Sequence, residues 1–274
     1  MSDVAALTTF LALGDSFTEG MSDELRPDGR YLGWADRLAA ALAEANPGMT
    51  YANLAVRGKL LDQVVVEQLI PALRMVVDPA TTLVSFHGGP NDALRPRVDL
   101  DDLVLRYDRA VRLLSDAGVT VMLFTVIERA GGNGRTASGL ANRFGTMNEA
   151  IRATAARYDV RLVDQAAVPA LQDRRMWNPD RLHLGPDGHR RVAALALHAL
   201  GQVDPSWPDD GRWWAVPLPP APPTTRSQEI SQDVRWLRSH LAPWIGRRLR
   251  GVSSGDGVRA KDAAPHPVAT SSSP

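Results

Sequence analysis

The sequence TTFLALGDSFTEG, residues 8–20, joins a short apolar run to Gly14, Asp15 and Ser16. Residues 8–13 have the length and composition of a buried β-strand. Gly14 permits a tight turn at the end of that strand, so Ser16 is expected in the loop beyond its carboxyl end. On its own, the Gly-Asp-Ser triplet is more typical of a helix cap or a turn than of a reactive serine.

Four further apolar runs of strand type follow, and they alternate with segments of helical periodicity. This alternation is typical of βα units around a parallel sheet, so we expect an α/β fold with a central sheet of five parallel strands. The loops after the strands should gather at one edge of that sheet, where Ser16 falls. The expected strands span residues 8–13, 50–55, 81–86, 119–126 and 160–163, and the expected helices span residues 33–45, 60–76, 100–117, 140–158 and 186–200.

The composition is that of one globular domain with additional segments: 274 residues, of which 44% are hydrophobic and 23% charged. Lysine plus arginine and aspartate plus glutamate each number 31, so the charge balance does not favour nucleic acid as a partner. Cysteine is absent, which excludes disulfides, thiolate metal sites and a cysteine nucleophile. The first residues lack a secretory signal pattern, and no apolar run reaches the roughly 18 residues of a membrane span. We therefore expect a cytoplasmic protein.

The last quarter of the chain differs in composition from the rest. Between Pro205 and Pro223 lie seven of the 20 prolines and three tryptophans, a composition that excludes regular helix and central strand. Beyond residue 250, serine, glycine, proline and alanine dominate, and no packed structure is expected. The expected segments are an α/β domain at residues 1–203, a connector at 204–226, an amphipathic helix at 227–250 and a disordered tail at 251–274.

The expected C-terminal helix carries apolar residues at helical spacing, among them Ile230, Val234 and Leu237, with arginines nearby. This stripe could dock on the α/β domain, mediate dimerisation, or lie on a membrane surface. Docking is favoured, because the tryptophan-rich connector leads into the helix. The oligomeric state stays open.

A serine that performs acyl transfer needs a base, a partner that orients the base, and donors for the developing oxyanion. Residues 180–183, Asp-Arg-Leu-His, lie directly before the last expected helix of the domain. His183 can face a serine through Nε2 while Asp180 holds the Nδ1 proton. A metal site built from His183, Asp187 and His189 is disfavoured, because its spacing differs from the i,i+4 histidine pair of helical zinc sites.

Two other loops offer hydrogen-bond donors at the same edge of the sheet. Gly58, after the second expected strand, can present a bare backbone N–H. Asn91, in the sequence HGGPND at residues 87–92, offers a side-chain amide. Each of these residues, taken alone, also fits an ordinary turn. His87 is expected to be a packed histidine rather than a base.

Taken in order, the blocks Gly14-Asp15-Ser16, Gly58, Gly89-x-Asn91-Asp92 and Asp180-x-x-His183 resemble those of the SGNH hydrolases, also called the GDSL esterase and lipase family. The resemblance covers roughly residues 8–200. It implies a three-layer α/β/α fold similar to flavodoxin, with Ser16 as nucleophile, His183 as base and Asp180 as the residue that orients it. It also implies an oxyanion hole formed by the backbone N–H groups of Ser16 and Gly58 and the side chain of Asn91. Pro90 is a departure that constrains the third block without removing Asn91.

The expected function is that of a serine esterase, which cleaves a carboxylic ester through an acyl-enzyme and needs neither metal nor cofactor. The substrate is expected to be a small-molecule or lipid ester. An acyltransferase or thioesterase could use the same residues, since exclusion of water decides between hydrolysis and transfer. An inactive α/β binding module is a third reading, which the intact set of Ser16, His183, Asp180 and Asn91 disfavours.

Four loops at the catalytic edge are expected to shape the substrate pocket. Among them, residues 129–135 are rich in glycine, which fits a mobile lid as well as an ordinary surface loop. The four loops span residues 21–32, 94–99, 128–138 and 166–178.

Overall fold

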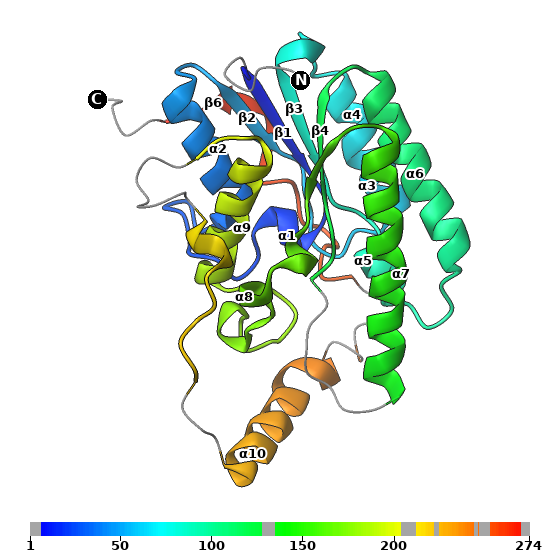
Figure 1. The fold of residues 1–274 in the computed structure, drawn as a ribbon, viewed down its shortest axis with the longest axis vertical. Helices are drawn as coiled ribbons and strands as arrows, with labels where there is room; N and C mark the ends of the chain where they lie inside the picture. Colours follow the sequence, from blue (N-terminus) through cyan, green and yellow to red (C-terminus); the bar gives the residue numbers. More distant parts are fainter. Residues whose placement is uncertain are drawn as a thin grey trace.

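A computed structural model describes residues 7–127, 135–203, 212–221, 225–243, 246 and 253–269 of the chain. Figure 1 shows a central sheet with helices on both of its faces, which is the three-layer α/β/α arrangement expected from the sequence. The expected glycine-rich lid falls largely outside the described residues. Within the described parts of the chain, no helix combines the length and apolarity that crossing a bilayer requires.

The central sheet has six strands in the order β5-β4-β3-β1-β2-β6. The first five are parallel, as expected, and Ser16 follows the central strand β1 directly. Because parallel strands are buried on both faces, each reads as an apolar run, which is why these five could be found from the sequence. They span Thr9–Leu13 (β1), Thr50–Asn53 (β2), Thr82–Phe86 (β3), Thr120–Phe124 (β4) and Arg161–Val163 (β5).

The sixth strand, β6 (Asp262–Pro267), corrects two expectations: the sheet is not five-stranded, and the last part of the chain is not without packed structure. β6 pairs antiparallel with β2, in a register that places His266 opposite Tyr51 and Asp262 opposite Asn53. Its Ala-Ala-Pro-His-Pro sequence lacks the β-branched residues of a strand and contains two prolines. Proline is tolerated on an edge strand, where one row of N–H groups has no ladder partner, so this strand has almost no sequence signal.

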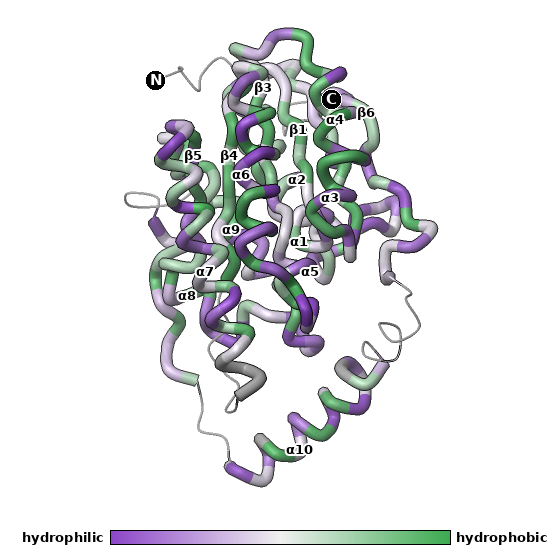
Figure 2. The backbone as a smooth tube through the Cα atoms, turned by 90° about the vertical axis from the view of Figure 1, so that its right-hand side faces the viewer, coloured by the Kyte–Doolittle hydropathy of each residue, from purple (hydrophilic) through white to green (hydrophobic). Residues whose placement is uncertain are grey.

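The two faces of the sheet form separate cores. In β1, Phe10 and Ala12 point to one core while Leu11 and Leu13 point to the other, as the two-residue period of a strand requires. α2 and α9 cover the first face and pack against each other, whereas α3, α4, α6 and α7 cover the second (Figure 1). Figure 2 shows the hydrophobic strands β3 and β4 behind helices that alternate between hydrophobic and hydrophilic residues.

The helices follow the expected periodicity with one exception. The expected helix at residues 60–76 consists of α3, a π-helical turn at Val65–Leu69 and α4. Pro71 lies in the first turn of α4; it has no N–H for the preceding turn, so the backbone there widens. The helices span Ser16–Glu19 (α1), Gly33–Ala45 (α2), Leu61–Val64 (α3), Ile70–Leu73 (α4), Pro90–Ala93 (α5), Leu100–Asp116 (α6), Arg135–Arg157 (α7), Pro169–Gln172 (α8), Pro186–Ala199 (α9) and Arg226–Trp236 (α10).

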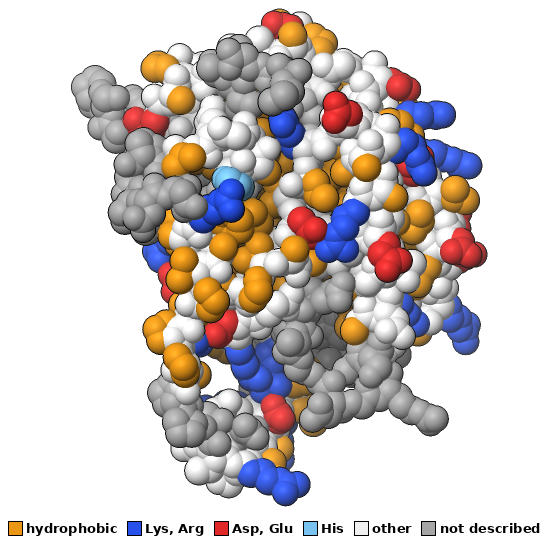
Figure 3. Space-filling view, viewed as in Figure 1, with side chains coloured by type: hydrophobic (Ala, Val, Ile, Leu, Met, Phe, Trp, Pro, Cys, Tyr) orange, Lys and Arg blue, Asp and Glu red, His pale blue; other side chains and the backbone are white. Residues whose placement is uncertain are grey.

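The tryptophan-rich connector packs on the domain where it is described. Trp214 is buried in the core beside α9, and the Arg191 guanidinium donates to the carbonyl oxygens of Trp213, Trp214 and Val216. Trp213 also borders a shallow pocket of about 290 Å³ between α2 and α9. On this side of the molecule, Figure 3 shows hydrophobic side chains gathered over α9.

Helix α10 continues into a π-helical turn at Leu237–Leu241 and lies apart from the layers, below them in Figure 1. Docking of its apolar side chains on the domain was expected, but the structure does not show it. Ile230, Val234 and Leu237 are 55%, 42% and 47% exposed. Among the described residues, the contacts of α10 with the domain include a hydrogen bond from Trp236 and an ion pair of Asp233.

Candidate active site

Ser16 is the first residue of α1 and lies half-buried just beyond the end of β1. Asp15 caps the helix by accepting a hydrogen bond from the backbone N–H of Phe17 at 3.1 Å. A Cβ atom at Gly14 would lie 2.6 Å from Thr18 Oγ1 and 2.8 Å from the carbonyl oxygen of His87, so only glycine fits this turn. Strand, glycine and cap together place the serine at a helix N-terminus, where backbone N–H groups favour negative charge.

A buried glutamine on the π-helical turn holds the turn before Ser16 in place. Gln68 Oε1 accepts from the N–H of Gly14 at 2.8 Å, and Gln68 Nε2 donates to the carbonyl oxygen of Gly14 at 2.8 Å. No motif in the sequence predicts a role for this residue. Gln68 lies more than fifty residues from Gly14 in the sequence. Its local backbone is distinguished by the widened π-helical turn.

His183 and Asp180 form the expected pair. His183 Nδ1 lies 2.7 Å from Asp180 Oδ2, while Asp180 Oδ1 accepts from the backbone N–H groups of Leu182 and His183 at 2.8 and 3.0 Å. Burial opposes ionisation of Asp180, but these hydrogen bonds outweigh it and lower the pKa of the carboxyl group. An ionised Asp180 holds the proton on Nδ1 and leaves Nε2 free to accept one.

Ser16 and His183 both belong to loops at the carboxyl edge of the sheet, one after β1 and the other before α9. Among the residues that the structure describes, no hydrogen bond joins the Ser16 hydroxyl to His183. Such contacts in serine enzymes often tighten only once substrate is bound. The described residues thus show the expected hydrogen bond between His183 and Asp180 and none between Ser16 and His183.

Gly58 follows β2 and adopts a left-handed backbone conformation with φ of +75°, which favours glycine. The preceding residue fastens its loop to the helix of Ser16: the Arg57 N–H donates to Glu19 Oε2 at 2.7 Å, and Arg57 Nε donates to Glu19 Oε1 at 2.9 Å. Glu19 is buried, so this ion pair is well protected from solvent screening.

Asn91 lies in α5 and connects two loops of the site. Its Nδ2 donates to Asp15 Oδ2 and to the carbonyl oxygen of Lys59, both at 3.0 Å. Asp15 also lies 3.4 Å from Nδ1 of His87, which is buried as expected and packs against the ring of Phe17. The Asp15 carboxylate, which the sequence analysis treated only as a cap, therefore joins the serine loop to two neighbouring loops.

The first histidine of α9 has a different environment from that of His183. His189 is buried on α9, and its Nε2 lies 3.1 Å from the carbonyl oxygen of Met21. Burial lowers its pKa to about 4, so the ring is neutral at physiological pH. Asp187 pairs with Arg190 instead of approaching either histidine. In the parts of the chain that are described, no three His, Asp or Glu side chains form a metal-ligand set.

Segments beyond α9 also contact the site, which was not expected from the sequence. Trp236 Nε1 donates to the carbonyl oxygen of Asp180 at 2.8 Å, and Asp233 pairs with Arg181 at 2.6 Å. At the other loop, a Cβ atom on Gly58 would lie 2.4 Å from Ser253 Oγ. These contacts link segments that are far apart in the chain, and no spacing of residues in the sequence predicts them.

Comparison with known proteins shows the family and the fold. The model of the GDSL-like Lipase/Acylhydrolase family matches residues 12–191. The fold resembles the crystal structure of TesA at 20% identity and a TM-score of 0.56, covering 70% of this chain and 97% of that one. It also resembles Axe2, an acetylxylan esterase from Geobacillus stearothermophilus, at 16% identity and a TM-score of 0.57, covering 73% and 97%. EstA, a psychrotrophic esterase from Pseudoalteromonas sp., matches at 14% identity and a TM-score of 0.54, covering 71% and 97%. No curated protein matches the chain.

Proposed function

The chain belongs to the GDSL-like lipase/acylhydrolase family, whose members hydrolyse esters, and from this premise we propose that it is a serine esterase with Ser16, His183 and Asp180 as its catalytic triad. The observation that carries the assignment is the hydrogen bond of 2.7 Å between His183 and Asp180, at the sheet edge where Ser16 begins α1. This arrangement supplies an oriented imidazole and a half-buried hydroxyl at the first residue of a helix.

In the proposed reaction, Ser16 Oγ attacks the ester carbonyl carbon while His183 Nε2 takes the hydroxyl proton. The imidazolium, stabilised by Asp180, returns this proton to the departing alcohol. Water then attacks the acyl-enzyme with His183 again as base, and the carboxylic acid leaves with Ser16 restored. Each step uses groups of this chain, so the reaction needs no cofactor.

The backbone N–H groups of Ser16 and Gly58 and the Asn91 amide are the proposed oxyanion donors. Asn91 Nδ2 already donates to Asp15 and to the Lys59 carbonyl. To stabilise the oxyanion, the amide would share one of these protons or give up one of these bonds. Because these bonds also connect the serine loop and the Gly58 loop, Asn91 would serve both as donor and as a brace between its fellow donors.

The test is turnover of p-nitrophenyl acetate by the wild-type protein and by Ser16→Ala and His183→Ala variants. Both substitutions should lower kcat by several orders of magnitude. Ser115→Ala, on α6, is a matched serine control that keeps wild-type turnover. A fluorophosphonate probe should label wild-type protein and spare Ser16→Ala. Full turnover by the Ser16→Ala protein would reject the assignment.

The same assay defines the reaction further. A series of p-nitrophenyl esters with increasing acyl length separates an acetyl esterase from a lipase-like enzyme. Added alcohols compete with water for the acyl-enzyme, so the ratio of new ester to free acid distinguishes hydrolysis from acyl transfer.

A further inference from the structure

The C-terminal extension, defined here as residues 212–221, 225–243 and 253–269, lies outside the matched family region, which ends at residue 191. It nevertheless reaches two loops of the proposed active site. One contact is with the loop of Asp180 and His183, and the other is with the loop of Gly58. The C-terminal extension, which the family match does not include, thus contacts two loops that carry residues of the family's sequence motifs.

The first contact is made by α10 and is specific in geometry. Trp236 Nε1 donates to the carbonyl oxygen of Asp180 at 2.8 Å, so the indole holds the main chain of the residue that orients His183. The Arg181 guanidinium lies 4.8 Å from the centre of the Trp236 ring and pairs with Asp233 at 2.6 Å. Arg181 itself has a left-handed backbone with φ of +61°, a costly conformation that its surroundings must maintain.

The second contact is made by the turn that begins at Ser253. Ser253 Oγ lies directly over Gly58, where it occupies the space that a side chain at residue 58 would need. Gly255 is buried against the main chain of Arg57: a Cβ atom there would lie 2.0 Å from the Arg57 carbonyl oxygen. The Gly58 loop is therefore enclosed between this turn on one side and Glu19 on the other.

The extension is fixed to the domain just after this turn. Lys261 is buried and donates to the carbonyl oxygens of Tyr31 and Leu32 at 2.9 and 2.8 Å, and it pairs with Asp36. Asp262 pairs with Arg26 at 2.7 Å and begins β6. Removing either partner of such a buried pair is strongly destabilising, so this anchor is firm. The turn at Ser253 is consequently held in place from its C-terminal side.

We propose that the C-terminal extension is a positioning element for catalysis, with Trp236 fixing the acid–base loop and the turn at Ser253–Gly255 fixing the oxyanion loop. The proposal rests on the proposed esterase function. Neither contact touches the reacting atoms; each acts through the residues it holds. Small displacements of catalytic groups are costly in rate, so a single hydrogen bond to the Asp180 main chain can influence turnover.

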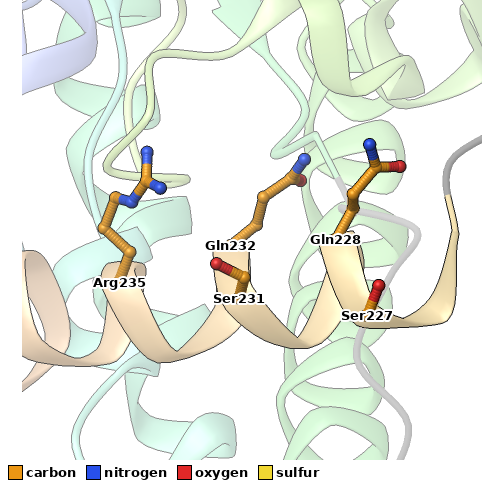
Figure 4. Close-up of a pocket in the computed structure, with 5 residues that line it drawn as sticks. All are labelled: Ser227, Gln228, Ser231, Gln232 and Arg235. Carbon is orange, nitrogen blue, oxygen red and sulfur yellow. The ribbon is translucent and has the colours of Figure 1, made fainter.

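Exposed side chains of α10 supply a matched control. Figure 4 shows Ser227, Gln228, Ser231, Gln232 and Arg235 projecting from the helix around a shallow pocket of about 390 Å³. Gln232 is exposed and adjoins Asp233 in sequence, but it makes none of the contacts with the acid–base loop described above. Substitution at this residue tests α10 without touching the proposed positioning contact.

The experiment compares Trp236→Phe, which keeps the aromatic ring and removes the N–H donor, with Gln232→Ala in the full chain. Trp236→Phe should lower kcat for p-nitrophenyl acetate by about tenfold while KM stays within about twofold. The rate of Ser16 labelling by a fluorophosphonate should fall in parallel, because labelling also needs an oriented His183. Gln232→Ala should match wild type in both assays.

A second variant and a stability measurement guard against a trivial loss of fold. Asp233→Asn should lower kcat by about threefold, since its pair with Arg181 is partly exposed. Thermal unfolding should show the same Tm for all variants within a few degrees. Wild-type kcat and labelling rate in Trp236→Phe would overturn the positioning role, and so would equal losses in Trp236→Phe and Gln232→Ala. Turnover that survives in Ser16→Ala would instead overturn the esterase assignment itself.

Discussion

The side chain of Gln68 satisfies both polar groups of the Gly14 main chain, accepting from its N–H and donating to its carbonyl oxygen, each at 2.8 Å. This pair of hydrogen bonds resembles the ladder between two β-strands, at the point where β1 ends and the turn before Ser16 begins. The glutamine therefore continues the hydrogen bonding of the sheet by one residue, and the Val56 N–H, in the segment after β2, also donates to the Gly14 carbonyl oxygen at 3.3 Å.

Replacing this glutamine should cost both stability and activity. Gln68→Leu leaves the buried N–H of Gly14 without its partner and leaves the Gly14 carbonyl oxygen with the longer bond of 3.3 Å from the Val56 N–H, which should lower the free energy of unfolding by about 2 kcal/mol. The serine turn should also lose its fixed geometry, so kcat should fall. Urea unfolding and ester turnover check both effects. Gln63→Ala, at an exposed glutamine whose Oε1 accepts from Leu60, is the control and should cost less than about 1 kcal/mol.

Asp180→Asn should lower kcat by about 10⁴-fold, the size of the effect known for the aspartate of the serine-protease triad. An asparagine amide at this position donates to the imidazole, which favours the wrong tautomer of His183. The fold should survive, because asparagine keeps the shape of the side chain. Asp187→Asn, on the first turn of α9, serves as control; equal losses in the two variants would contradict a specific role for Asp180.

Asn91→Ala should lower kcat by about 10²- to 10³-fold with a smaller change in KM, as expected for an oxyanion donor. Asn91→Asp should be at least as damaging, because it places a second carboxylate beside Asp15. Steady-state kinetics on p-nitrophenyl acetate distinguishes these variants from Asn46→Ala, which removes an amide at the end of α2. Unchanged kcat in Asn91→Ala would leave the oxyanion to the backbone donors alone.

Gly255→Ala should lower kcat by roughly tenfold through the Gly58 loop, since its methyl group collides with the Arg57 carbonyl oxygen. Gly257→Ala is the matched control in the same turn: its Cβ meets nothing within 4 Å, although its φ of +75° adds strain of about 1 kcal/mol. Turnover and Tm measured for both variants separate the contact from the strain. A larger loss of turnover in Gly257→Ala would argue against the contact.

The pH dependence of stability should carry a contribution from His189. Burial lowers the pKa of His189 to about 4 in the folded protein, against 6.5 for an ordinary histidine. Between these values the unfolded chain binds the extra proton, so stability is full above pH 6.5 and falls as the pH drops toward 4. The loss should amount to about 3 kcal/mol.

His189→Gln should remove this slope, as followed by urea unfolding at several pH values. Burial raises the pKa of Asp36 to about 6, which acts in the opposite direction over the same range. Because both proteins share Asp36, the difference between their curves isolates the histidine. An identical slope in the variant would exclude His189 as its source.

The sequence predicted the parallel strands and the main helices because each has a local cause: a buried strand must be apolar, and a helix on a sheet must be amphipathic. β6 could not be found this way. Its stability comes from the free edge of β2 and from the buried charges of Lys261 and Asp262, which do not depend on strand propensity.

The same distinction applies to the site. Ser16, Asp180 and His183 lie in short motifs whose spacing reflects local geometry, so their loops could be predicted. Gln68 and Trp236 form hydrogen bonds with main-chain atoms of distant residues. Because these main-chain groups do not depend on residue type, the contacted sequence does not reveal the partner. Such residues can be identified only once the structure shows which distant segments are in contact.

The antiparallel pairing of β6 with β2 also bears on how the chain is made. β2 leaves the ribosome roughly 200 residues before its partner, so at about 5–20 residues per second its edge stays open for on the order of ten seconds or more. An open strand edge invites pairing with another chain. The nascent protein therefore presents β2 as a free strand edge until β6 has been synthesised and covers it.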